Sequence, residues 1–201
     1  MKTGILGGTF NPPHYGHDIL GKCLYSQMGL DRVLVIPDGF PPHKTPPFLA
    51  SDEDRAQMCR YVFTDSIYTI DMLETYRSGR SFTIDTLKAL KDKYPDDEFY
   101  LAVGSDMLMS FHTWSHPQQI LDSCTVCAAS RKGTDSEKLM ISYCNTRYKQ
   151  QFENGRIRIL SCEPLVISSS ALRDMIKRGD DMHDYMPGSE INYIKERGLY
   201  K

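Results

Sequence analysis

The chain has 201 residues, of which 40% are apolar and 25% are charged, the composition of an ordinary globular domain. Its 24 Lys and Arg against 26 Asp and Glu give a net charge of −2, which excludes the broad basic surface of proteins that coat nucleic acids or membranes. No apolar stretch approaches the ~18 residues that a membrane helix needs. No export signal is recognisable, so the six cysteines are typical of reduced cytosolic thiols and we expect a cytoplasmic protein.

Short apolar or β-branched runs alternate with helix-like segments along the chain. The runs predict strands at 2–6, 32–36, 66–72, 98–103, 124–129 and 156–161. The remaining segments predict helices at 15–28, 52–63, 81–94, 117–121, 136–152, 168–178 and 189–197. Ser51 and Ser81 are expected to cap their helices, and Gly198 is expected to end the last one.

This alternation predicts βαβ units and hence an α/β fold, a Rossmann-like doubly wound parallel sheet with a small C-terminal helical extension. We expect a single domain over 1–201, with the α/β core at about 1–165 and the helical part at about 166–201. Ligands of such sheets bind where the strands end. The residues that follow each strand are therefore the candidate site.

The loop after the first strand has the most specific pattern, Gly7-Gly8-Thr9-Phe10-Asn11-Pro12-Pro13-His14-Tyr15-Gly16-His17. The glycines let backbone amides approach a ligand, and the two histidines share one face at the start of a helix, where anions bind. The loop is neither a Walker A loop nor a dinucleotide fingerprint. The alternative to an anion site is a purely structural one, a tight strand-to-helix turn with two partly buried histidines. A zinc site lacks an obvious third ligand, so we expect no metal held by the protein.

Later segments repeat this pattern of polar residues after a strand. Lys44 follows the second strand in Pro41-Pro42-His43-Lys44, and Gly104-Ser105-Asp106 closes the fourth. Three serines and Arg173, in Ile167-Ser168-Ser169-Ser170-Ala171-Leu172-Arg173, combine helix capping with a second cradle for phosphates. Each has a structural alternative, namely a solvated lysine, a capping aspartate and plain serine capping.

Three further signals have a less definite reading. Cys124 and Cys127 form a Cys-x-x-Cys, but on a strand their thiols would point to opposite faces, so we expect core cysteines. Trp114 is the single tryptophan, and the sequence alone favours a position in the core. Arg131, just beyond the fifth strand in a locally basic stretch, is a candidate for a substrate contact.

Taken in order, these segments resemble the bacterial nicotinate-nucleotide adenylyltransferases of the His-x-Gly-His nucleotidyltransferase superfamily. The match includes the first loop, Pro41–Lys44, Ser81–Leu87, Gly104–Asp106 with Trp114, Ile167–Arg173 and the terminal Ile191–Ile194 with Leu199-Tyr200. His-x-Gly-His alone identifies the superfamily, whereas the ordered set is much more specific. The resemblance implies transfer of AMP from MgATP to nicotinate mononucleotide, which gives deamido-NAD and pyrophosphate.

The site residues that we predict fall into three groups. The catalytic group is His14, His17, Lys44 and Arg173. The ATP-binding group is Gly7, Gly8, Thr9, Phe10, His14, His17, Gly104, Asp106, Ile167, Ser168, Ser169 and Arg173. The group for nicotinate mononucleotide is Asn11, Lys44, Thr83, Asp85, Trp114 and Arg131. In this reading Asp106 binds a ribose, and Thr83 and Asp85 line the nicotinate pocket.

The expected partners are ATP and nicotinate mononucleotide, with Mg²⁺ carried mainly by the ATP phosphates. No nucleic acid polymer and no membrane are expected, and homo-oligomerisation is left open. Two other readings remain. One is a different acceptor within the superfamily, such as nicotinamide mononucleotide, phosphopantetheine or glycerol phosphate, and the other is a non-catalytic nucleotide sensor.

Overall fold

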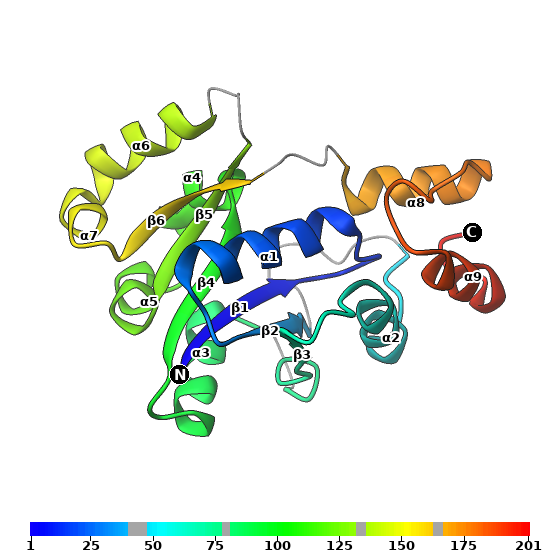
Figure 1. Ribbon diagram of the computed structural model, residues 1–201, viewed down its shortest axis with the longest axis horizontal. Helices are drawn as coiled ribbons and strands as arrows, with labels where there is room; N and C mark the ends of the chain where they lie inside the picture. Colours follow the sequence, from blue (N-terminus) through cyan, green and yellow to red (C-terminus); the bar gives the residue numbers. More distant parts are fainter. Residues whose placement is uncertain (40–47, 78–80, 132–135, 163–166) are drawn as a thin grey trace. The chain divides into compact units, whose positions relative to one another are not determined.

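The structure is a computed structural model that describes residues 1–39, 48–77, 81–131, 136–162 and 167–201. Its strands form one six-stranded sheet in the order β3-β2-β1-β4-β5-β6 (Figure 1). Strands β1, β4, β5 and β6 pair in parallel. The order turns back between β1 and β4, as in a doubly wound Rossmann-like sheet, and the predicted fold class is confirmed. The strands are β1 (Lys2–Gly8), β2 (Arg32–Pro37), β3 (Tyr68–Ile70), β4 (Glu98–Gly104), β5 (Thr125–Arg131) and β6 (Ile157–Cys162).

The helices alternate with these strands and then continue past the last one. They are α1 (Tyr15–Met28), α2 (Asp52–Val62), α3 (Thr83–Lys93), α4 (Ser105–Met109), the 3₁₀ turn η1 (Phe111–Thr113), α5 (Pro117–Ser123), α6 (Ser136–Arg147), α7 (Lys149–Glu153), α8 (Ser169–Arg178) and α9 (Gly188–Arg197). The single helix expected at 136–152 is interrupted at Tyr148, which separates α6 from α7. No helix in the described part of the chain is long and apolar enough to cross a membrane.

The predicted helix ends are confirmed in two of three places. The Ser51 hydroxyl accepts a hydrogen bond from the Asp54 amide at 3.1 Å, and Gly198, at φ +62°, ends α9. The prediction for Ser81 was wrong. Phe82 is the N-cap residue of α3 and makes no side-chain cap bond, because Ser81 lies one position too early for its hydroxyl to reach the free amides of the first turn.

The chain folds into two compact units, each assembled from separate stretches. The first unit contains Met1–Leu6, Leu20–Leu34 and Phe82–Pro164, and the second contains Gly7–Ile19, Val35–Ser81 and Leu165–Lys201. Strands β1 and β2 therefore begin in the first unit and end in the second. The loop after β1 and the last part of the sequence thus belong together in the second unit.

The core of the first unit forms around strand β5. This strand pairs with β4 from Tyr100↔Thr125 to Gly104↔Ala129 and with β6 from Val126↔Ile157 to Arg131↔Cys162. A strand paired on both sides and covered by helices is expected to be a continuous apolar run, and Val126, Cys127 and Ala128 are fully buried. All six cysteines are free thiols, and Cys124 and Cys127 are buried, as predicted.

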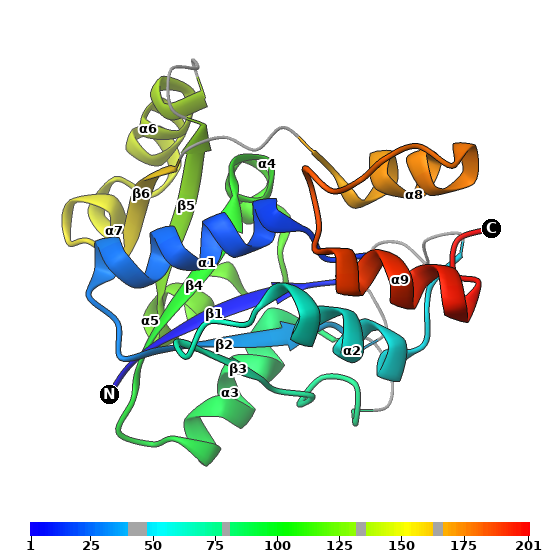
Figure 2. The same ribbon diagram turned by 45° about the vertical axis from the view of Figure 1, so that its right-hand side comes forward.

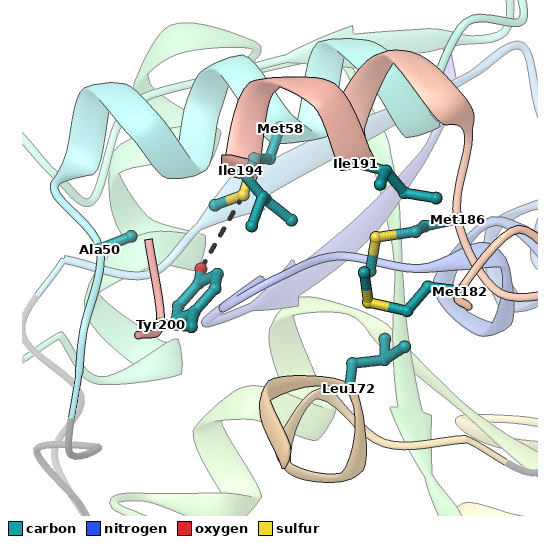
Figure 3. Close-up of a cluster of buried hydrophobic side chains, with 8 residues drawn as sticks. All are labelled: Ala50, Met58, Leu172, Met182, Met186, Ile191, Ile194 and Tyr200. Atoms are coloured by element: carbon teal, nitrogen blue, oxygen red, sulfur yellow. Dashed lines mark hydrogen bonds between the residues drawn. The ribbon is translucent and has the colours of Figure 1, made fainter. Parts of the chain in front are cut away.

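The core of the second unit joins α2, α8 and α9. Figure 2 shows α2 and α9 side by side. A cluster of eight buried side chains fills this core (Figure 3): Ala50, Met58, Leu172, Met182, Met186, Ile191, Ile194 and Tyr200. Three methionines adapt to gaps that stiffer side chains would leave, and the cluster ties the C-terminal helices to α2.

Glu190, in the first turn of α9, is a buried acid of the second unit. It is 0% exposed, and neither carboxyl oxygen has a hydrogen-bond partner among the residues that the structure describes. Burial raises the pKa of Glu190 well above its usual value, because a low-dielectric interior disfavours the charged form. The carboxyl group is thus protonated in the folded protein over a pH range in which the unfolded chain is already ionised.

We expect Glu190→Gln to remove a pH-dependent loss of stability. The contribution of Glu190 is fully present below its unfolded pKa and declines as the pH rises toward the folded pKa. In that window the free energy of unfolding should fall by about 1.4 kcal/mol per pH unit relative to Glu190→Gln. Urea unfolding of both proteins between pH 5 and pH 8 measures the difference. Glu196→Gln, at an exposed position of the same helix, is the control, and parallel curves for wild type and Glu190→Gln would contradict the prediction.

Candidate functional site

The loop between β1 and α1 places two histidines together at the start of a helix. The ring centroids of His14 and His17 lie 3.8 Å apart and the ring planes are tilted by 34°. The backbone amide of His14 donates a hydrogen bond to Nδ1 of His17 at 3.2 Å. This bond fixes the neutral tautomer of His17, with its proton on Nε2, so Nε2 is free to donate to a ligand.

Gly16 is required by the approach of the His14 ring. A Cβ atom at position 16 would lie 2.9 Å from Nδ1 and 3.0 Å from Cε1 of His14. Contacts this short do not occur for real side chains, so any other residue would displace the ring. The glycine of His-x-Gly-His is therefore part of the geometry of the histidine pair.

Both histidines are neutral at physiological pH. Burial lowers the pKa of His14 to about 4. Burial also lowers the pKa of His17 well below its usual value, and the neighbouring His14 adds to this effect. The pair therefore offers hydrogen-bond donors to an anion without carrying fixed positive charge in the free protein.

Phe10 supports the histidine pair from inside the protein. Its side chain is 1% exposed, and its ring meets His17 edge-on at 5.1 Å between centroids. The same ring packs against Phe63 at 5.6 Å. We grouped Phe10 with the ATP-binding residues, and that assignment stays a prediction; its ring lies in the core beside His17.

Asn11 is enclosed by hydrogen bonds within its own unit. Its side chain is 1% exposed. Oδ1 accepts from the Ala50 amide at 3.0 Å and from the Tyr200 hydroxyl at 2.7 Å, while Nδ2 donates to the Phe48 carbonyl at 3.3 Å. We grouped Asn11 with the residues for nicotinate mononucleotide, and that assignment stays a prediction; in the structure these bonds engage its side-chain amide and fix the loop.

Helix α8 contributes a cation and a hydroxyl to the same loop. Nη1 of Arg173 donates to the Asn11 carbonyl at 2.8 Å, and the Ser169 hydroxyl donates to the Pro12 carbonyl at 2.7 Å. The Ser168 hydroxyl caps α8 by accepting from the Ala171 amide at 3.2 Å, as predicted. Ile167 lies beside Gly16, since its Cγ2 would be 3.8 Å from a Cβ there. The loop and α8 are therefore in contact.

Arg55 is a buried cation that sequence analysis missed. It is 0% exposed and donates to the carbonyls of Thr9 (2.9 Å) and Asp38 (2.7 Å) and to the side chains of Asp38 (3.1 Å) and Asp52 (2.6 Å). The Thr9 hydroxyl also donates to Asp38 at 2.8 Å. In the sequence Arg55 is one charge on an amphipathic helix, so nothing marks it as a buried group that holds the loop.

Gly7 and Gly8 belong to the second unit, and the other described candidates lie in the first. Asp106 is exposed in the first turn of α4, directly after Gly104 ends β4. Trp114 is half-buried and packs at 5.2 Å between ring centroids on the buried Phe111, so one part of its ring is covered and another is accessible. Thr83 and Asp85 are partly exposed in the first turn of α3.

Two predicted residues cannot be placed. Lys44 lies outside the described residues. Arg131 is the last residue of β5, and its side chain is outside the described part. A cavity of about 600 Å³ in the first unit lies at the beginnings of β4 and β5, where Phe99, Thr125 and Arg156 line it. None of the predicted site residues lines this cavity.

The described residues offer no protein cage for a metal ion. Among them, no group of three His, Cys, Asp or Glu side chains could hold one. The described donors around the loop are instead hydroxyl, imidazole, guanidinium and amide groups. Such a set suits an anion that brings its own cation.

Comparisons with known proteins agree with this arrangement. The cytidylyltransferase-like family model matches residues 5–175. A probable nicotinate-nucleotide adenylyltransferase of Lachnoclostridium phytofermentans is 32% identical over 202 aligned residues, covering 99% of this chain and 98% of the relative. One from Lactiplantibacillus plantarum is 34% identical and covers 100% and 88%.

A solved structure has a similar fold. Plasmodium falciparum nicotinic acid mononucleotide adenylyltransferase, complexed with NaAD, superposes with a TM-score of 0.78 at 21% identity, over 100% of this chain and 98% of that one. At this identity the similarity concerns the fold.

We predict that His14 remains neutral well below pH 6. An NMR pH titration of the imidazole resonances should give His14 a midpoint near its pKa of about 4, because protonation would place a charge in a buried site. Comparison with His14→Gln assigns the signal. A midpoint at pH 6 or above would contradict the buried, neutral pair.

Proposed function

The chain belongs to the nicotinate-nucleotide adenylyltransferase family, and we propose that it transfers the adenylyl group of ATP to nicotinate mononucleotide. The products are deamido-NAD and pyrophosphate. The observation that supports this best is the neutral histidine pair His14 and His17, at a helix start, in one compact unit with Arg173.

The reaction needs no covalent intermediate on the protein. An oxygen of the 5′-phosphate of nicotinate mononucleotide attacks the α-phosphorus of ATP, and the bond from that phosphorus to the bridging oxygen of pyrophosphate breaks. The nucleophile is already an anion, so no base has to remove a proton. The protein must bring two mutually repelling phosphates together and stabilise the charge that develops between them.

His14 and His17 would donate hydrogen bonds to the transferring phosphate and its leaving group. Nε2 of His17 is the defined donor, because its Nδ1 already accepts from the His14 amide. His14 has an unpartnered Nδ1 that is buried in the free protein. Neutral donors bind a polyanion without being buried as charges beforehand, and an arriving phosphate would favour their protonated forms.

Arg173 and the serines would form the second half of the phosphate site. The guanidinium group of Arg173 donates one N–H to the Asn11 carbonyl. Because it has five N–H donors in all, others would remain for phosphate oxygens. Ile167, Ser168 and Ser169 place the start of α8 beside the loop. Gly7, Gly8 and Thr9 would present backbone amides to the nucleotide, and Lys44 would add a cation.

The remaining assignments depend on the family resemblance. Asp106 and Gly104 would bind a ribose of the nucleotide. Trp114 would stack on the pyridine ring with its accessible part. A nicotinate pocket would be formed by Thr83 and Asp85, and Arg131 would contact the same substrate.

Mg²⁺ would enter this site already bound to the phosphates of ATP. Bound to phosphate oxygens and water, Mg²⁺ would offset the negative charge of the triphosphate and pyrophosphate. The donors described around the loop are neutral or cationic, which suits phosphate oxygens better than the ion itself. The protein would therefore hold the ion through ATP.

We expect a panel of acceptors with MgATP to give the highest kcat/KM for nicotinate mononucleotide. The panel also contains nicotinamide mononucleotide, phosphopantetheine and glycerol phosphate, and pyrophosphate release is measured. A preference for another acceptor would reassign the substrate within the superfamily. ATP binding with no pyrophosphate release from any acceptor would identify a nucleotide sensor instead of an enzyme.

We expect His17→Ala to lower kcat on the order of 100- to 1,000-fold, as removal of a preorganised donor does. Folding should be little affected, which circular dichroism and the melting temperature check. His183→Ala is the matched control, because His183 lies in the same unit, is 66% exposed in its side chain and pairs only with Asp181 in the described contacts. Near-normal turnover by folded His17→Ala would overturn its catalytic role.

A further inference from the structure

Tyr200, the penultimate residue, is fixed in an unusual backbone conformation. Its φ angle is +65°, in the left-handed region that bulky residues rarely adopt. Its side chain is only 5% exposed and packs into the apolar cluster of the second unit (Figure 3). Such a conformation persists only when the surrounding structure holds it, so the position of the Tyr200 ring is strongly determined.

The Tyr200 hydroxyl donates a hydrogen bond to the side chain of Asn11, which lies 189 positions earlier in the sequence. The distance to Asn11 Oδ1 is 2.7 Å, and the Met58 sulfur lies farther away, at 3.8 Å. A hydroxyl has one proton, and the amide oxygen is the better acceptor, so the bond belongs to Asn11. Burial raises the pKa of Tyr200 beyond its usual value, which keeps this hydroxyl a donor at every working pH.

Asn11 is itself part of the loop that carries the histidines, and other bonds from the C-terminal part hold the same loop. Its own carbonyl accepts from Arg173 at 2.8 Å, and the next carbonyl, that of Pro12, accepts from Ser169 at 2.7 Å. Farther along, the Tyr15 amide donates to the Tyr185 carbonyl at 2.8 Å. All these residues belong to the second unit. The C-terminal segment therefore holds both ends of the stretch that contains His14.

We propose that Tyr200 is a positioning residue for adenylyl transfer, which acts by fixing Asn11 and through it the loop of His14 and His17. The inference rests on the proposed function. A tyrosine that never meets substrate would thus influence the rate of the chemical step, because small displacements of preorganised donors are costly in the transition state.

Tyr200→Phe tests this by removing one oxygen and leaving the ring in the cluster. We expect kcat for nicotinate mononucleotide to fall about 10-fold while the KM for ATP changes less than about 2-fold, since the loop donors act mainly on the transition state. Tyr193→Phe is the matched control. Its hydroxyl also makes a 2.7 Å bond from the C-terminal part, but to Asp54, which keeps Arg197 at 3.0 Å. Tyr193→Phe should retain wild-type kcat.

A double-mutant cycle with Asn11→Ala tests the route of the effect. If Tyr200 acts through Asn11, adding Tyr200→Phe to Asn11→Ala should lower kcat no further than about 2-fold. If instead the two substitutions lower kcat by independent factors that multiply in the double variant, the proposed route is overturned. Equal kcat in wild type, Tyr193→Phe and Tyr200→Phe would overturn the proposal itself.

An NMR readout separates this inference from the proposed function. Tyr200→Phe should shift the imidazole resonances of His14 and His17, whereas Tyr193→Phe should not, at temperatures well below the melting point of each variant. If the wild type transfers no adenylyl group, the proposed function fails, and this shift still decides whether Tyr200 positions the loop. Unchanged imidazole resonances in Tyr200→Phe would refute the positioning role.

Discussion

The candidate site depends on hydrogen bonds that side chains donate to three backbone carbonyls of the loop between β1 and α1. The carbonyls of Thr9, Asn11 and Pro12 accept hydrogen bonds from Arg55, Arg173 and Ser169. A loop that satisfied these groups with water would have many conformations, whereas fixed side-chain donors select one. The direction of the His14 and His17 rings follows from that selected path. The chemistry proposed for the histidines therefore depends on donors that lie elsewhere in the second unit.

Neutral histidines explain how a chain with a net charge of −2 can serve a polyanionic substrate. Burying two imidazolium ions side by side would cost free energy through both desolvation and mutual repulsion, and the lowered pKa values of His14 and His17 express that cost. Hydrogen-bond donors at a helix start avoid it and remain specific for an anion. In the proposed reaction a few cations such as Arg173 would supply the compensating positive charge, so a generally basic surface is unnecessary.

The sequence predicted the elements better than the contacts between them. Apolar runs, and caps such as Ser51 and Gly198, are local signals. Most helices and strands therefore lie within a few residues of their predicted bounds. Ser81 was misjudged because a serine one position before the cap has the same local pattern as a cap. The motifs also led us to predict His14, His17 and Arg173 as catalytic residues, and the structure places all three in the second unit. They could not reveal that the Phe10 ring lies in the core or that the Asn11 side chain is hydrogen-bonded within the protein.

The missed residues share a physical reason. Arg55, Tyr200 and Glu190 have the residue types of ordinary surface or core positions, and only the tertiary fold makes them special. The bond between Tyr200 and Asn11 joins residues 189 positions apart, and that between Arg173 and Asn11 joins residues 162 apart. No periodicity or spacing rule extends over such distances, because those rules describe neighbours on one helix or strand. The motif near the start of the chain is therefore held in place by residues near its end, which makes the C-terminal helices part of the candidate site.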